Sequence, residues 1–184
     1  MIEFNATDFE NLYNQYKILV YNVALNYLQN IEDAEEITQD VFVQLHQSLD
    51  KFQNNSTLKT WIYRITINKC LDFIKHKNSK KRFFIFGTKS NSEFELQKAT
   101  DFEHPGILME NKEDAEILFG VINQLNENQK TAFLLSKVEG MTNPEIATIM
   151  EVSISSVESL VFRAKSTLKE KLNIKFDNYR KKKN

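Results

Sequence analysis

The chain has 184 residues, of which 41% are hydrophobic, and its 24 Lys and Arg nearly balance 25 Asp and Glu to a net charge of −1. This length suits one or two small domains with hydrophobic cores. Only four glycines and two prolines are present, too few for the turns of a sheet protein, so an all-α fold is expected. We expect no signal peptide, membrane span, cofactor or cysteine-based metal site, and a cytoplasmic location.

The charges are segregated along the chain. Residues 1–58 are mainly acidic, residues 59–89 are mainly basic, and the chain ends in a basic tail over residues 175–184. The neutral total therefore conceals one acidic block and two basic ones. Such segregation indicates different partners for different surfaces.

Two amphipathic helices are predicted first, over about residues 8–29 and 32–48. Thr7 with Glu10 predicts a capping box at the start of the first helix, and Asn30 is expected to start the second. The first helix is interpreted as core packing throughout. The second has an apolar face that consists of Ala34, Ile37, Val41, Leu45 and Leu49.

The outer face of the second helix is acidic and carries amides. Acidic residues in the first turn are explained by their favourable interaction with the helix dipole. This explanation does not apply to Gln39, Asp40 and Gln44, because they lie beyond the first turn. We interpret this face as a dock for a basic protein surface. Its candidate binding residues are Glu36, Gln39, Asp40 and Gln44.

Residues 50–56 are predicted to form a loop in which Ser56 caps a helix over 57–77. This helix is apolar around most of its circumference, apart from a polar stripe with basic residues at its C-terminal end; the stripe comprises Thr60, Arg64, Asn68, Asp72 and Lys75. A solvated face with cations at the helix C-terminus is one interpretation. The other is a surface for single-stranded nucleic acid, because amides can read exposed base edges and cations can follow the backbone.

Residues 79–106 lack helical periodicity and are interpreted as a flexible linker. The run Phe83–Phe86 is unusual there; packing against the first domain is favoured over a partner contact. A helix over 108–124 should follow, with Ala115, Leu118, Phe119, Ile122 and Leu125 inward. Asn126 and Gln129 should cap the next helix, which is predicted to end at Gly140. The residues of this helix expected to face the core are Ala132, Phe133, Leu135 and Val138.

Residues 142–172 predict a short helix, a tight turn and a longer helix. Thr142 and Glu145 form a capping box, and Ser153 opens the longer helix. That pattern is typical of a helix-turn-helix whose second helix enters a DNA major groove, although an ordinary amphipathic hairpin has the same spacing. Small hydroxyls and an aromatic ring on the polar face favour DNA binding: Ser155, Ser156, Ser159 and Phe162.

These segments resemble the extracytoplasmic-function sigma factors, the smallest group of bacterial RNA polymerase sigma factors. DAEEITQDVF (33–42) resembles the region-two helix that docks on the polymerase clamp, and TWIYRITINKCLD (60–72) resembles the promoter-melting helix. Residues 125–172 resemble region four. The resemblance implies region two at 1–78, a linker at 79–106 and a four-helix region four at 107–174.

The resemblance also implies site residues and partners. The partners would be core RNA polymerase, promoter DNA and, by the group alone, an anti-sigma factor. The minus-ten contacts would be Asn54, Asn55, Arg64, Asn68, Lys69, Asp72 and Lys75. The minus-thirty-five contacts would be Ser155, Ser156, Glu158, Ser159, Phe162 and Arg163. Trp61 would pack rather than act as a melting wedge.

Some residues depart from the family pattern. Glu151 stands where many relatives have a turn glycine, which is tolerable if the turn avoids positive φ. Leu160 and Glu158 remove positive charge from the reading helix, which predicts weak affinity of the chain alone for duplex DNA.

Two other classes of function are weighed against this one. An autonomous helix-turn-helix regulator with an all-α sensor or dimerisation domain has no need of the acidic 32–44 face or the basic, asparagine-bearing 54–82 segment. An enzyme is disfavoured, because the sequence has no phosphate loop, no glycine-rich nucleotide turn and no metal-ligand cluster.

Overall fold

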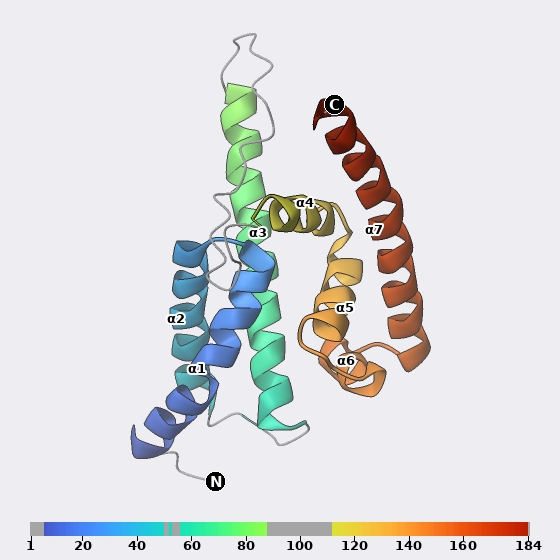
Figure 1. Ribbon diagram of the computed structural model, residues 1–184. Coiled ribbons are helices and arrows are strands. Elements are labelled where there is room, and N and C mark those ends of the chain that lie inside the picture. The colour runs from blue at the N-terminus through green and yellow to red at the C-terminus, as the bar shows by residue number, and fades with distance from the viewer. Residues whose placement is uncertain (1–5, 50–51, 53–55, 88–111, 184) are drawn as a thin grey trace. The chain divides into compact units, whose positions relative to one another are not determined.

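The computed structural model describes residues 6–49, 52, 56–87 and 112–183, and within these ranges the secondary structure is helical, with no strand. Figure 1 shows the seven helices. The all-α prediction is confirmed. The chain divides into two compact units, which comprise residues 1–104 and 105–184.

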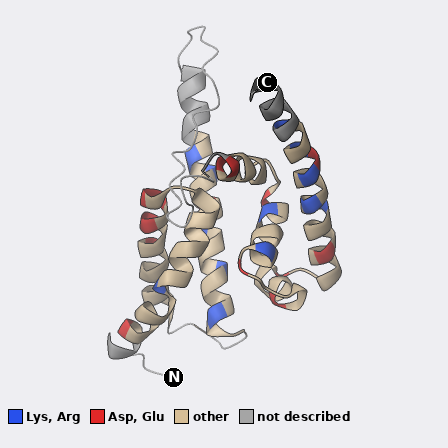
Figure 2. Ribbon diagram, in the orientation of Figure 1, with Lys and Arg blue, Asp and Glu red and all other residues tan. Residues whose placement is uncertain are grey.

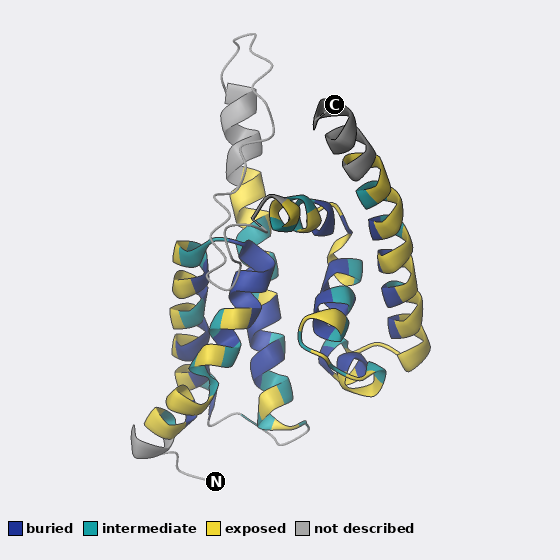
Figure 3. Ribbon diagram, viewed as in Figure 1, coloured by how far each residue is buried: buried dark blue, intermediate teal, exposed yellow. Residues whose placement is uncertain are grey.

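The first unit contains α1 (Ala6–Leu28), α2 (Ile31–Ser48) and α3 (Leu58–Gly87), and each of these helices packs against the other two. The five apolar positions predicted for α2 are all buried, as is Phe42, which was not predicted. Cys70 is completely buried in α3. This three-helix core leaves the outer faces of α2 and α3 open to solvent, as Figure 3 shows.

The helix starts in this unit differ partly from prediction. Asn30 caps α2 as predicted, and its Oδ1 accepts from the Asp33 amide at 2.8 Å. The first helix already begins at Ala6, so Thr7 lies inside it rather than at its cap. Ser56 does not cap α3, because it is Thr57 whose Oγ1 accepts from the Thr60 amide, at 3.1 Å. Ser and Thr are nearly equivalent caps, so adjacent candidates cannot be ranked from sequence.

Helix α3 is longer than predicted and continues to Gly87, through the first residues of the predicted linker. Once a helix is nucleated, each further residue costs little, and nothing between Lys77 and Gly87 is a glycine or proline that would stop it. The side chains of the Phe83–Phe86 run lie outside the described residues.

The second unit contains α4 (Lys112–Ile122), α5 (Glu127–Lys137), α6 (Asn143–Met150) and α7 (Ile154–Lys183). Helices α4, α5 and α6 all contact α7, and the predicted four-helix helix-turn-helix architecture is confirmed. Asn126 caps α5 as predicted, accepting from the Gln129 amide at 2.9 Å. The last helix continues through residues assigned from sequence to the basic tail.

Two residues predicted to face the core of this unit are exposed instead, Leu118 and Val138. On α4 Leu118 lies on the same side as the buried Val121 and Ile122 but one turn earlier, so its exposure shows that this face is covered only toward the C-terminal end of the helix. Helix α5 ends at Lys137, so Val138 is a C-cap residue and Gly140, with φ of 67°, lies two positions beyond it. Helical spacing predicts which residues share a face, but it does not predict how far along the helix that face is covered, and it applies only while the helix lasts.

The turn between α6 and α7 adopts a left-handed conformation at a residue that is not glycine. Glu151 has φ 57° and ψ 42°, and the Val152 amide donates to the Ala147 carbonyl at 3.1 Å. This is a Schellman motif with Glu151 at C′, a position that usually holds glycine. The condition on which Glu151 is expected from the sequence to be tolerated, a turn without positive φ, is therefore not met, and the turn carries backbone strain.

Candidate functional site

The candidate protein-binding residues of α2 share one face. Glu36, Asp40 and Gln44 recur every four residues, which places them above one another on the helix, and Gln39 lies beside them. All four side chains are exposed. Figure 2 shows acidic residues along α2 and basic residues along the neighbouring α3.

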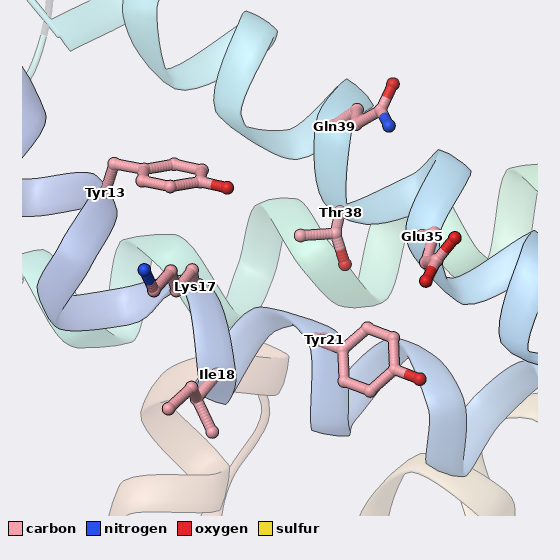
Figure 4. A pocket seen from close by; sticks show the side chains of 7 residues that line it. All are labelled: Tyr13, Lys17, Ile18, Tyr21, Glu35, Thr38 and Gln39. Atoms are coloured by element: carbon pink, nitrogen blue, oxygen red, sulfur yellow. The ribbon is translucent and has the colours of Figure 1, made fainter.

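A groove between α1 and α2 adjoins this face. It is lined by Tyr13, Lys17, Ile18, Tyr21, Glu35, Thr38 and Gln39, which Figure 4 shows on the two facing helices. The Ile18 side chain is 65% exposed although it is large and apolar. The sequence interpretation of the first helix as core packing did not find this groove.

A second hollow continues the first along the same two helices, because Tyr13 and Gln39 line both. An aromatic cluster forms its floor, with the Phe42 ring 4.7 Å from Tyr13 and 6.5 Å from Phe9 between centroids. Val43 on its rim is 56% exposed. Exposed apolar residues on both rims are typical of a docking groove, and the shared Gln39 connects the hollows to the predicted binding face.

The predicted stripe of α3 is solvent-facing along most of its length. Asn68, Asp72 and Lys75 are exposed, and Arg64 and Lys69 are partly buried. Asn54 and Asn55 lie outside the described residues. The opposite face is buried in the core, from Ile62 to Cys70, so the stripe is held on a rigid element.

Ion pairs join α2 to α3 within the described residues. The Lys69 Nζ lies 3.3 Å from the Asp40 Oδ2, and the Lys77 Nζ lies 2.6 Å from the Asp33 Oδ2. The first pair links a residue predicted to bind protein with one predicted to bind DNA, so the two surfaces meet at this point. The separation of acidic and basic blocks along the sequence indicated different surfaces for different partners.

Trp61 is partly buried beside Phe52, with ring centroids 5.0 Å apart and planes inclined by 32°. This contact ties the loop before α3 to the helix. The packing role predicted for Trp61 fits the contact.

The recognition face of α7 is exposed at each of its predicted positions, which are Ser155, Ser156, Glu158, Ser159, Phe162 and Arg163. Phe162 is 74% exposed, whereas Val157, Val161 and Ala164 on the opposite side are buried. An aromatic side chain so exposed contributes nothing to the core. Its position on a polar face indicates a contact with a partner.

Hydroxyls cluster at the start of α7. The Ser153 Oγ accepts from the Ser156 amide at 3.2 Å and lies 2.7 Å from the Ser156 Oγ and 3.0 Å from the Ser155 Oγ. At the start of α6, the Glu145 Oε2 accepts from the Thr142 amide at 2.8 Å and from its hydroxyl at 2.7 Å. Both predicted caps are confirmed, one at the start of each helix of the helix-turn-helix.

A buried lysine, Lys130, is the residue of this unit that sequence reasoning missed. Its Nζ donates to the Asn123 Oδ1 at 2.6 Å and joins α5 to the turn after α4. Lysines are seldom buried, so nothing in the sequence pattern marks it.

Among the described residues no helix could cross a membrane and no acidic, histidine or cysteine cluster could hold a metal.

Family models match each unit separately. Sigma-70 region 2 matches residues 12–80, and sigma-70 region 4 matches residues 115–168. The chain is 26% identical over 165 residues to the RNA polymerase sigma-H factor of Pseudomonas aeruginosa, covering 89% of this chain and 86% of that protein. It is 28% identical over 141 residues to the ECF RNA polymerase sigma-E factor of Escherichia coli K12, covering 76% and 74%.

Solved structures share the fold. The sigma factor RpoE of Bartonella quintana, in complex with the anti-sigma factor NepR, superposes with a TM-score of 0.68 at 21% identity, over 92% of this chain and 99% of that one. CnrH in complex with the cytosolic domain of CnrY gives 0.65 at 19% identity, over 92% and 90%.

Proposed function

Because this chain belongs to the extracytoplasmic-function group of the sigma-70 family, we propose that it binds bacterial core RNA polymerase, directs it to specific promoters and helps to melt the minus-ten element. The observation that carries the proposal is the location of the two matched regions, one on each compact unit. Each unit exposes a face with the chemistry that its region requires.

The outer face of α2 and the α1–α2 groove together form the polymerase-binding surface. Glu36, Asp40 and the amides of Gln39 and Gln44 suit a basic partner, while Ile18 and Val43 offer apolar contacts beside them. Acidic side chains repel DNA phosphates, so this surface selects protein. A polar patch beside an apolar groove matches the usual anatomy of a protein interface.

The stripe of α3 receives the non-template strand of the minus-ten element. Asn68 and Asp72 carry the hydrogen-bonding groups that read base edges, and Arg64, Lys69 and Lys75 follow the phosphates. Asn54 and Asn55, which precede α3 in the sequence, hold an extruded base. Capture of the strand offsets the few kcal/mol that unstacking a base costs, on the order of those seen in base flipping.

The exposed face of α7 lies in the major groove of the minus-thirty-five element. Ser155, Ser156, Glu158 and Ser159 reach base edges, and Phe162 contacts an apolar group there, such as a thymine methyl. Arg163 contacts phosphate. The helix-turn-helix, with a cap at the start of each helix, presents this face as a rigid unit.

The domain assignment follows from these surfaces. Residues 1–78 act as region two and 107–174 as region four, and the residues between connect them within the polymerase. The protein works as a cytoplasmic specificity subunit with no catalysis of its own, so no step of the function requires a cofactor. An anti-sigma factor is a further expected partner, as the similar sigma factor RpoE was solved in complex with the anti-sigma factor NepR.

In vitro transcription over a promoter library tests the proposal. Purified core polymerase alone should initiate at random, and addition of this chain should give transcripts from templates that share a minus-ten and a minus-thirty-five motif, read by sequencing. Binding of operator DNA by the chain as a dimer, without affinity for core polymerase, would instead establish an autonomous regulator.

A further inference from the structure

The ion pair between Asp40 and Lys69 connects two surfaces that the proposed function uses in succession. Asp40 belongs to the polymerase-binding face of α2, and Lys69 follows Asn68 on the DNA-binding helix α3. Their side chains meet at 3.3 Å in the protein without partners. While the ion pair persists, Asp40 therefore cannot fully contact the polymerase and Lys69 cannot fully contact the DNA.

The pair is accessible enough to exchange partners. The Asp40 side chain is 55% exposed and that of Lys69 is 32% exposed. The lysine head is carried on a flexible four-carbon stem, so it can turn from α2 toward the stripe of α3 without movement of the helix. An exposed ion pair contributes little to stability, so a new partner for each charged group easily offsets the loss of the pair.

The other pair between these helices differs and provides an internal comparison. The Lys77 Nζ lies 2.6 Å from the Asp33 Oδ2, and the Asp33 side chain is only 18% exposed. Asp33 also sits at the capped start of α2, where its amide donates to Asn30. Its role is to hold the helix start, and it lies outside the proposed binding face.

We propose that Lys69 is passed from Asp40 to a promoter phosphate when core polymerase engages Asp40, so that this ion pair couples polymerase binding to capture of the minus-ten strand. The inference rests on the proposed function of both surfaces. A basic group of the polymerase replaces Lys69 beside the Asp40 carboxylate. The released ammonium then adds one cation to the DNA-binding stripe.

The size of the coupling follows from the exposure of the pair. A surface ion pair of this kind shifts an equilibrium by about two- to five-fold. By linkage the effect is reciprocal: polymerase favours DNA binding by the factor by which DNA favours polymerase binding. The free protein is correspondingly less able to bind single strands than the protein on core.

Lys69→Gln in the full-length chain tests the proposal, because it should have opposite effects in two assays. In the absence of DNA, affinity for core polymerase should rise about two- to five-fold, because the Asp40–Lys69 ion pair no longer has to be broken before Asp40 binds the polymerase. Affinity of the assembled holoenzyme for a single-stranded minus-ten oligonucleotide should fall. The slope of log affinity against log salt in that second assay should decrease by about 0.7.

Two further variants identify the origin of the effect. In an Asp40→Asn background, Lys69→Gln should give no gain in polymerase affinity, because the gain acts through that carboxylate. The matched variant Lys77→Gln removes the same charge from the other pair and should leave polymerase affinity unchanged. Both assays should use fluorescence anisotropy at fixed salt.

Equal gains from Lys69→Gln with and without Asp40, or no gain at all, would overturn the coupling. A wild-type chain that does not bind core polymerase would overturn the proposed function itself. A wild-type chain that binds core and opens promoters, with polymerase affinity indifferent to Lys69→Gln, would leave the proposed function standing and remove only the coupling.

Discussion

Glu151 shows how a single residue departs from what its position requires. With φ of 57°, it occupies a left-handed conformation that costs a residue with a Cβ roughly 1–2 kcal/mol. The turn persists because the capped helices on either side, and the packing of α6 on α7, impose it. The position matters for function because the turn sets the angle between α6 and the reading helix.

Replacement of Glu151 with glycine should therefore stabilise the second unit. The relief of strain exceeds the entropy that glycine adds to the unfolded chain, which leaves a gain of about 0.5–1 kcal/mol. Thermal unfolding followed by circular dichroism should show a midpoint raised by a few degrees. Glu151→Ala is the matched control: it removes the same side chain but keeps the strain, so an equal rise for alanine would contradict the explanation.

Each side of helix α2 has different neighbours, and these neighbours determine what kind of surface each side forms. Its buried face packs on α1 and α3, its edge toward α1 forms the groove, and its edge toward α3 forms the ion pairs. The groove exists because Ile18 and Val43 lie at the rims of the α1–α2 contact, where neither is covered.

A charge placed in this groove should weaken polymerase binding and leave the fold intact. Ile18→Glu and Val43→Glu each replace an exposed apolar side chain, and each should lower affinity for core polymerase about ten-fold or more, since burial of such a side chain contributes about 1.5–3 kcal/mol. Thermal unfolding should be unchanged. Titration of labelled chain with core polymerase measures the effect.

Ile174→Glu supplies the control for this pair, because Ile174 is also 56% exposed but lies on α7 in the second unit. It should retain wild-type affinity for core polymerase. If all three variants bind equally well, the groove takes no part in the interface and the polar face of α2 acts alone.

At the scale of the whole molecule, the proposed binding functions are divided between two units. The first unit carries the proposed polymerase-binding face and the α3 stripe, and the second carries the face of α7 proposed to recognise DNA. Because separate units hold the two DNA-binding surfaces, promoter recruitment and promoter opening should respond to different substitutions.

Asn68→Ala and Phe162→Ala test this division as a pair. Asn68→Ala should slow promoter opening, measured by permanganate reactivity, more than it lowers holoenzyme binding to duplex promoter. Phe162→Ala should lower that binding roughly five-fold, equivalent to about 1 kcal/mol of lost apolar contact, and leave the opening rate of bound complexes unchanged. Equal loss at both steps for Asn68→Ala would argue against strand capture.

Net charge belongs to the same scale. With a total of −1, and with Glu158 on the reading helix, the chain has little general attraction for duplex DNA. The protein alone should bind a promoter duplex far more weakly than the holoenzyme does, and the gap should persist at low salt. Anisotropy with and without core polymerase measures it; comparable affinities would show that the chain recognises promoters unaided.

The sequence by itself determined the helical class and the helix-turn-helix with its caps, and it supplied the residues proposed for the three binding faces, because helical periodicity, capping and turn composition are properties of contiguous residues. Only the tertiary structure decided that Asp40 meets Lys69, that α1 and α2 leave a groove at Ile18 and Val43, and that Glu151 takes a positive φ. Each of these depends on how separate helices pack, and the spacing of residues along one helix carries no information about the side chains that another helix brings beside it.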